Sequence, residues 1–257
     1  MRTRYVDFDD RHEDLAERMR ALPEQADDFM KKWELSWLYH ENALEGVVYT
    51  SQELALGLEN QPVADATFVG ALRDIRNHKT AIDLVRAEAR GKKLKLNLSM
   101  VKKLYETLGA GFEGRSVAEW RKDMPLHRSY FHEIAQPARI QPALQKVFDV
   151  TDSVDFKNAH PIVQAVKLHH GFMQVFPFTE NSGRVARLFA NMILFQAGYL
   201  PVIIHATDRQ RYYESLRQPE AVLRELTLDA IENGLAHAEK HFAGLAAGKG
   251  GARKLVR

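Results

Sequence analysis

A short turn between two helical patterns carries the side chains of this chain that are best suited to bind phosphate. Residues 176–187 read FPFTENSGRVAR. A helix that begins in such a turn offers unpaired backbone N–H groups and a partial positive charge to an anion. Two arginines three residues apart lie on one side of a helix, and guanidinium groups bind phosphate oxygens in pairs. The candidate phosphate-binding residues are Asn181, Ser182, Gly183, Arg184 and Arg187.

The carboxylate just before the turn, Glu180, is the candidate metal ligand. Mg²⁺ is usually bound through one or two carboxylates together with substrate phosphates. We therefore expect Glu180 to hold Mg²⁺ against a bound polyphosphate. The alternative is an ordinary helix-turn-helix with solvated arginines, and this would be favoured for an isolated turn of this kind.

Two helices must position the turn. Apolar side chains recur with helical spacing over residues 160–175 and again over 183–198. Pro177 cannot continue the first helix, and Asn181, Ser182 and Gly183 are residue types of turns and N-caps. The sequence therefore predicts two helices joined by a turn that opens at the N-terminus of the second.

Helical spacing also accounts for most of the remaining chain, so we expect an all-α fold. A capping-box pattern at 50–53 opens a further helix, and periodicity fails between 109 and 142. There, residues 127–138 suggest extended chain or a short irregular hairpin. We expect one globular unit with an N-terminal helical region (1–90), a core (91–217), and a C-terminal helix with a basic tail (218–257). The other helices are expected at 10–21, 26–43, 65–89, 97–108, 142–150, 207–217 and 219–243.

Composition narrows the class of protein. The 257 residues are 45% hydrophobic and 27% charged, as in an ordinary globular protein, and no apolar run approaches the length of a membrane span. The absence of cysteine excludes disulfides, thiolate catalysis and Cys-ligated zinc, and it fits the cytoplasmic location that we expect. A net charge of +2 argues against nucleic acid as the partner.

The stretch FPFTENSGRVAR resembles the signature of the Fic (Fido) family, H-P-F-x-[DE]-G-N-G-R-x-x-R. Three positions differ: Phe176 stands in place of the family's histidine, Asn181 replaces a glycine, and Ser182 replaces the asparagine. The resemblance extends over roughly residues 30–217 and implies a Fic-type helical domain with a flap at 127–138. The matching positions are Pro177, Phe178, Glu180, Gly183, Arg184 and Arg187.

The resemblance implies an activity that the residues do not fully support. In the family, the signature histidine takes the proton from a target hydroxyl, which attacks the α-phosphate of ATP so that AMP is transferred. Phe176 cannot accept a proton, and loss of a general base typically lowers the rate by about 10²–10⁴-fold. The resemblance therefore implies binding of a nucleotide such as ATP, with Mg²⁺, without the usual histidine-based transfer. Two alternatives stay open: an active nucleotidyl- or phosphoryl-transferring enzyme with a substitute base, and a non-catalytic binding or regulatory module.

Three histidines are candidates for a substitute base. His127 and His132 lie in the flap, whose edge in the family binds an extended segment of a target protein by β-augmentation. His170 lies on the helix before the turn, next to His169. For His169 and His170 we favour hydrogen-bonded packing roles, and the histidines show no recognisable metal-ligand spacing.

Glu45-Gly46 resembles the end of a second family motif, the inhibitory-helix pattern [ST]-x-x-x-E-[GN]. The match is partial, because Glu41 stands where the motif has serine or threonine. In the family, the motif's glutamate pairs with the second arginine of the signature and blocks placement of the ATP γ-phosphate. The resemblance therefore implies a regulatory role for Glu45, and we predict that its side chain lies near Arg187.

Overall fold

The protein is described by a computed structural model that covers residues 2–59, 68–115, 117–125 and 133–252. Within these ranges all regular structure is helical, which confirms the predicted all-α class. The main helices are α1 (Arg2–Ala21), α2 (Pro23–Leu44), α3 (Ser51–Leu58), α4 (Val69–Ala89), α5 (Leu98–Gly109), α6 (Ile140–Asp149), α7 (Val154–Asn158), α8 (Pro161–Val175), α9 (Ser182–Gln196), α10 (Arg209–Ser215) and α11 (Glu220–Ala252).

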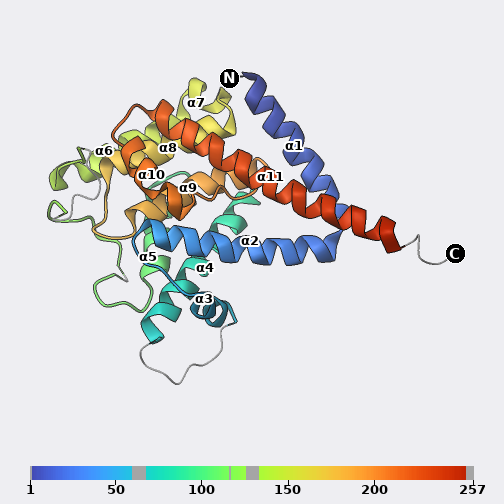
Figure 1. The fold of residues 1–257 in the computed structure, drawn as a ribbon. Helices are drawn as coiled ribbons and strands as arrows, with labels where there is room; N and C mark the ends of the chain where they lie inside the picture. Colours follow the sequence, from blue (N-terminus) through green and yellow to red (C-terminus); the bar gives the residue numbers. More distant parts are fainter. Residues whose placement is uncertain (1, 60–67, 116, 126–132, 253–257) are drawn as a thin grey trace.

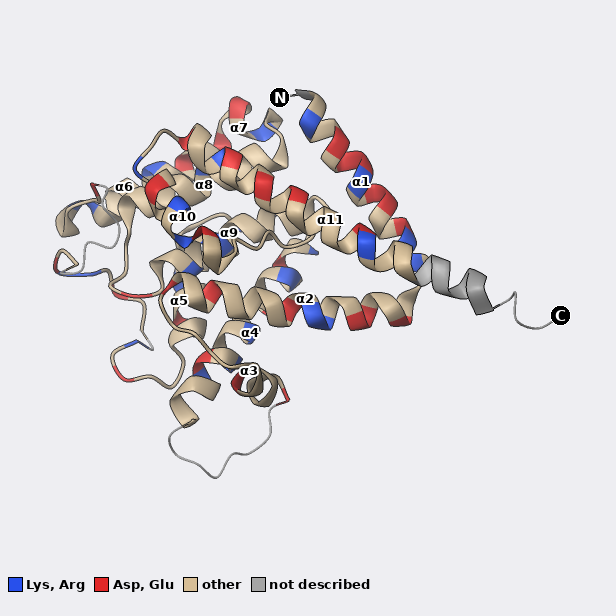
Figure 2. Ribbon diagram, viewed as in Figure 1, with Lys and Arg blue, Asp and Glu red and all other residues tan. Residues whose placement is uncertain are grey.

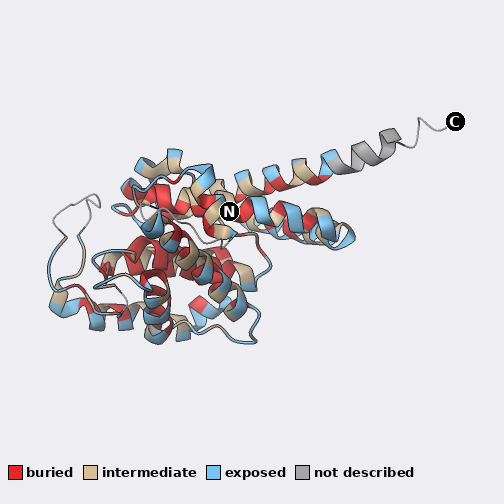
Figure 3. Ribbon diagram, turned by 90° about the horizontal axis from the view of Figure 1, so that it is seen from below, coloured by how far each residue is buried: buried red, intermediate tan, exposed pale blue. Residues whose placement is uncertain are grey.

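Helices α8 and α9 form the centre of the molecule. They pack against each other, with α4 against α9 and α11 against α8 (Figure 1). Buried residues gather in the middle of the helical bundle (Figure 3). Nearly every residue of α9 is buried, including polar ones near its start. A helix that is enclosed on all sides can present its N-terminus only to neighbouring elements, so the surroundings of the turn are set by α2, α4 and α10.

Helix α2 brings Glu45, the residue that the family resemblance implies is regulatory, to this centre. One face of α2 is buried, with Trp37 and Leu38 fully enclosed, and the helix ends at Leu44. Gly46 follows with φ of 89°, a left-handed conformation that stops the helix and that glycine adopts without strain. The carbonyl oxygen of Leu44 accepts hydrogen bonds from Nε of Arg209 and the hydroxyl of Tyr213, each at 2.8 Å. The end of α2 is thus fixed against α10.

Helix α1 packs on α11 at the periphery, and both helices carry acidic and basic residues (Figure 2). Arg11 donates to Glu232 and to Glu239 at 2.8–3.1 Å, and Arg4 pairs with Asp229. These are partly exposed ion pairs, and such pairs mainly fix register and add little stability.

Local sequence signals fix several helix ends. Thr50 and Glu53 form the predicted capping box, and the side chain of Asn97 accepts from the backbone N–H of Met100 at the start of α5. The helix predicted from residue 65 begins at Val69, and 60–67 lie outside the described residues.

Only part of the predicted flap can be compared with the structure. Residues 127–132, with His127 and His132, lie outside the described residues. The described remainder has no regular structure up to Gln136 and then enters a 3₁₀ turn, Pro137–Arg139. The side chains of all three predicted regions contribute to one hydrophobic cluster, and the division at residues 90 and 217 stays a prediction. No described helix combines the length and apolar character needed to cross a bilayer.

Candidate functional site

The turn between α8 and α9 is held in an unusual backbone conformation. Phe176 (φ 48°) and Asn181 (φ 61°) are the two non-glycine residues of the described chain in the left-handed region. Asparagine adopts this region with little strain, as the glycine that it replaces in the Fic signature would. Phenylalanine does so only when its surroundings enforce it, and Phe176 is buried in the core. The aromatic ring therefore makes this end of the turn apolar.

Arg121 helps to hold Phe176 in this left-handed conformation. Its Nε donates to the carbonyl oxygen of Phe176 at 2.7 Å, a second guanidinium nitrogen donates to Val175 and Ala135, and its backbone N–H donates to Pro177. A cation at the C-terminal end of α8 satisfies carbonyl groups that have no helical partner. Sequence reasoning missed Arg121, because it lies in a segment without periodicity and matches no motif.

Inside the turn, Ser182 and Phe178 hold each other. The Ser182 hydroxyl donates to the carbonyl oxygen of Phe178 and accepts from its N–H, both at 2.9 Å. Phe178 is fully buried and stacks on Tyr105 with a centroid separation of 4.0 Å. The predicted phosphate ligand Ser182 thus uses its hydroxyl within the turn.

Arg187 lies between two carboxylates of α2 and its C-terminal end. Its Nη2 donates to Oε1 of Glu45 at 2.7 Å, which confirms the predicted pairing. Its Nε donates to Oε2 of Glu41, also at 2.7 Å. The side chains of Arg187 and Glu41 are 3% and 2% exposed, so this second pair is almost fully withdrawn from water. Glu41 is therefore a structural partner of Arg187, although the sequence offered it only as a mismatch to the inhibitory motif.

Arg184 is also held by hydrogen bonds to side chains of other elements. Its two terminal nitrogens donate to the two oxygens of Asp74 on α4 at 2.9 and 3.0 Å, and also to the side-chain oxygens of Asn42 and Asn181. The Asp74 carboxylate accepts a further bond from Tyr49 at 2.8 Å. Burial would raise the pKa of Asp74, but Arg184 and Tyr49 hold it below its ordinary value. The predicted anion-binding arginines are thus brought together by the fold, and each is already paired with a carboxylate.

Gly183 lets the Glu45 carboxylate approach the N-terminus of α9. A Cβ atom added at Gly183 would collide with Oε1 of Glu45 and would lie 2.8 Å from Nη1 of Arg187. The carboxylate therefore lies at the helix start, where an external anion would otherwise be favoured.

We expect Gly183→Ala to lower the free energy of unfolding by about 1–3 kcal/mol, because the methyl group overpacks the Glu45–Arg187 contact. Urea denaturation measures this change. The matched control is Gly244→Ala in α11, where a Cβ meets nothing within 4 Å and should be neutral or stabilising by up to about 1 kcal/mol. The penalty should shrink in a Glu45→Ala background. Equal penalties with and without Glu45 would contradict the contact.

Glu180 sits apart from the two arginines. Its carboxylate is about half exposed and pairs with Arg115 at 2.8 Å. Within the described ranges, no cluster of three or more histidine and acidic side chains could hold a metal by itself. One carboxylate fits Mg²⁺ only when ligand phosphates complete its coordination, and the ion would then neutralise phosphate charge.

The histidines of α8 point into hydrogen bonds with the C-terminal part of the chain. His170 donates to the carbonyl oxygen of Gln218 at 3.1 Å. His169 is buried and lies 2.9 Å from the hydroxyl of Tyr212. The same hydroxyl accepts a hydrogen bond from Arg187. Burial and Arg187 lower the pKa of His169 to about 3. Both histidines therefore have the hydrogen-bonded packing roles that we favoured.

One buried histidine was not singled out by the sequence. His78 on α4 is fully buried and neither ring nitrogen has a hydrogen-bond partner among the described residues. Burial and the charge of Arg184 lower its pKa to about 3, so the ring is neutral at pH 7. It lies in the helix interface beside the arginines.

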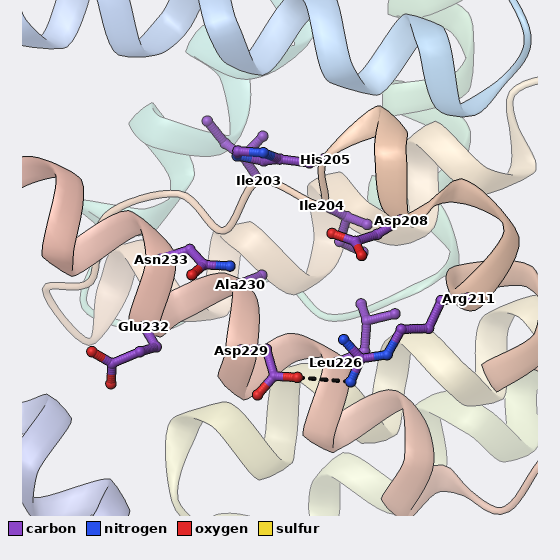
Figure 4. Close-up of a pocket in the computed structure, with 10 residues that line it drawn as sticks. All are labelled: Ile203, Ile204, His205, Asp208, Arg211, Leu226, Asp229, Ala230, Glu232 and Asn233. Atoms are coloured by element: carbon purple, nitrogen blue, oxygen red, sulfur yellow. Dashed lines mark hydrogen bonds and ion pairs between the residues drawn. The ribbon is translucent and has the colours of Figure 1, made fainter.

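A cavity of about 270 Å³ lies elsewhere, between residues 203–211 and α11. Figure 4 shows its lining, including the ion pair between Arg211 and Asp229 at 2.7 Å. It contains none of the residues that the sequence selected.

Comparison with known proteins places this geometry in a family. Residues 95–194 match the model of the Fic/DOC family. This part of the chain is a Fic-type domain. The turn between α8 and α9, which resembles the Fic signature, lies within the matched residues.

The curated relatives of this chain are enzymes by name. It is 25% identical over 181 residues to Protein adenylyltransferase Fic of Nematostella vectensis, covering 70% of this chain and 42% of the relative. It is 24% identical over 180 residues to the protein of the same name from Drosophila willistoni, covering 70% and 36%. The chain thus spans less than half the length of these relatives.

Solved structures share its fold. A Fic domain containing signaling protein from Bacteroides thetaiotaomicron superposes with a TM-score of 0.76 at 21% identity, covering 91% of this chain and 97% of that one. Fic-1 from C. elegans gives a TM-score of 0.74 at 18% identity, covering 96% and 73%. At this level of identity the likeness concerns the fold.

Proposed function

We propose that this Fic protein binds a phosphate-bearing ligand at the N-terminus of α9 when Glu45 is displaced, and that it does not transfer AMP by the histidine-based mechanism. One observation carries the proposal: the Glu45 carboxylate lies against Gly183 and Arg187, at the position an anion would take. The site is therefore suited to a negative charge, and in this structure it receives one from the chain itself.

The side chain at position 176 does not supply the general base that AMP transfer needs. It is buried and apolar, and the histidines on α8 donate or accept hydrogen bonds elsewhere. The pKa of His169 is lowered to about 3 and that of Tyr212 is raised to about 12, so neither gains or loses a proton easily near pH 7. A general base works best when its pKa lies near the working pH. These side chains support binding without turnover.

A nucleotide and a protein are the partners that we propose. The curated relatives bear the name adenylyltransferase, which describes transfer from a nucleotide to a protein. Glu180 would contribute one ligand to Mg²⁺ on a bound phosphate. A protein segment would bind near 127–138, where the family has its flap.

The second candidate, an active transferase with a substitute base, is favoured by one observation. Both arginines, Glu180 and the flanking helices of the signature are retained around the altered turn. Titration with nucleotides and intact-mass measurement after incubation with ATP separate this function from binding without transfer.

We expect calorimetric titration with ATP, AMP and inorganic phosphate, each with Mg²⁺, to detect binding in Glu45→Gln that is at least about tenfold tighter than in wild type. Adding Arg184→Ala should weaken that binding at least about tenfold, because it leaves the Asp74 carboxylate without its counter-charge beside the site. Intact mass after incubation with ATP should show no added AMP in either protein.

Circular dichroism must first show that each variant is folded. A robust Mg²⁺-dependent AMP increment on wild type or on an added protein would overturn the claim of no transfer. Absence of binding by all three ligands to folded Glu45→Gln would overturn the claim of a ligand site.

A further inference from the structure

Displacing Glu45 does not leave two free arginines. This inference rests on the function proposed above and concerns the ligand of the same site. Arg187 keeps Glu41, and Arg184 keeps Asp74, because neither contact involves Glu45. The charge that the site offers to a ligand is therefore set by four buried or nearly buried side chains.

Glu41 is held in its charged form by its contacts. Oε2 accepts from Nε of Arg187 at 2.7 Å, and Oε1 accepts from Nε1 of Trp37 at 3.4 Å. Burial raises the pKa of Glu41 above its ordinary value, and Arg187 opposes that rise without cancelling it. Since both oxygens face donors, a carboxyl proton would meet no acceptor, and hydrogen bonds to the charged form favour it. Glu41 thus neutralises Arg187 whether or not Glu45 is present.

Asp74 neutralises Arg184 in the same way. The pair is bidentate, the guanidinium side chain is 5% exposed, and Tyr49 donates a further hydrogen bond to the carboxylate. Bidentate pairs of this kind are geometrically specific and strong. A ligand phosphate would have to break them to obtain both terminal nitrogens of Arg184.

When Glu45 is displaced, the charge of Arg187 is still neutralised by Glu41, and that of Arg184 by Asp74. What remains to attract an anion is the N-terminus of α9, with about half an elementary charge, and Nη2 of Arg187, which Glu45 has left. A triphosphate would bring several negative charges close to Glu41 and Asp74, where little water screens their repulsion. A single negative charge would simply replace that of Glu45.

We propose that the site selects a phosphate ester with one negative charge over a polyphosphate such as ATP, and that Glu41 is the residue that sets this preference. The inhibitory motif has serine or threonine at this position, so Glu41→Ser removes the extra charge and keeps a side chain that the motif allows. The ligand class follows from the charges of this chain, and it differs from the ATP that the relatives' names suggest.

Three ligands with the same base and ribose test the proposal by calorimetry on Glu45→Gln without Mg²⁺: the methyl ester of AMP with one charge, AMP, and ATP. We expect the methyl ester to bind at least about tenfold more tightly than ATP, with AMP between them. In Glu41→Ser with Glu45→Gln, the ratio should move toward ATP by about tenfold or more. The control, Glu24→Ser with Glu45→Gln, removes an exposed carboxylate of the same helix and should leave the ratio unchanged.

ATP binding more tightly than the methyl ester to Glu45→Gln would overturn the selectivity while leaving the ligand site in place. An unchanged ratio after Glu41→Ser would overturn the role of Glu41. If no ligand binds to either folded variant, the site itself fails, and this inference fails with it. Should the Glu41 variant not fold, the order of the three ligands on Glu45→Gln still decides the selectivity.

Discussion

Arg187→Leu should lower the free energy of unfolding by about 3–5 kcal/mol at pH 7, the cost of removing one partner from a buried ion pair. Arg187 is 3% exposed and is the charged partner of Glu41, which is 2% exposed. Leucine leaves the Glu41 carboxylate buried without a counter-charge and leaves Glu45 without its contact. Urea denaturation of the variant and wild type measures the difference.

The pH dependence of this loss identifies its cause. Burial without Arg187 raises the pKa of Glu41 in the folded variant above its unfolded value of about 4.3. The folded state then holds a proton that the unfolded state releases, so stability falls as pH rises above about 4.3. The deficit should therefore be smallest in acid and grow toward neutral pH. Glu41→Leu with Arg187→Leu should recover most of the loss. A deficit that is equal at pH 4.5 and pH 7, with no rescue, would contradict the buried pair.

Phe178→Ala is expected to destabilise the protein by about 3–5 kcal/mol, the range for removing a buried phenylalanine. The ring is fully buried, stacks on Tyr105 and lies against Trp120 with centroids 5.2 Å apart. Since the backbone of Phe178 also bonds to the Ser182 hydroxyl, the cavity should loosen the start of α9. Thermal or urea unfolding measures the first effect.

Hydrogen exchange of the backbone amides between 178 and 187 measures the second effect. Phe68→Ala is the control, because this phenylalanine is 37% exposed and should change stability by at most about 1 kcal/mol. A Phe178→Ala protein as stable as this control, with unchanged exchange, would show that the ring does not hold the turn.

Local signals in the sequence determined the elements around the site. Helical spacing over 160–175 and 183–198 predicted α8 and α9 to within a few residues, and Pro177 marked the break between them. The capping box at Thr50 was likewise predicted, because capping involves residues three positions apart. Such contacts form wherever the helix forms, so a single chain segment suffices to reveal them.

The contact between Glu45 and Arg187 was predicted for a different reason. The two residues lie 142 positions apart, and only the resemblance to the Fic family connected them. By its own chemistry, Glu45 was an ordinary residue at a helix end. The same resemblance presented Glu41 as a departure from a motif, and it gave no reason to expect that carboxylate inside the site.

Tertiary structure alone decided which charges neutralise the arginines. Asp74 lies 110 residues from Arg184, Glu41 lies 146 from Arg187, and Arg121 lies 55 from the carbonyl of Phe176. No periodicity links such positions, because each contact depends on how α2, α4 and the segment around Arg121 pack on α8 and α9. The sequence therefore predicted two arginines at a helix N-terminus. The packing of those helices determined that each arginine is already paired with a carboxylate.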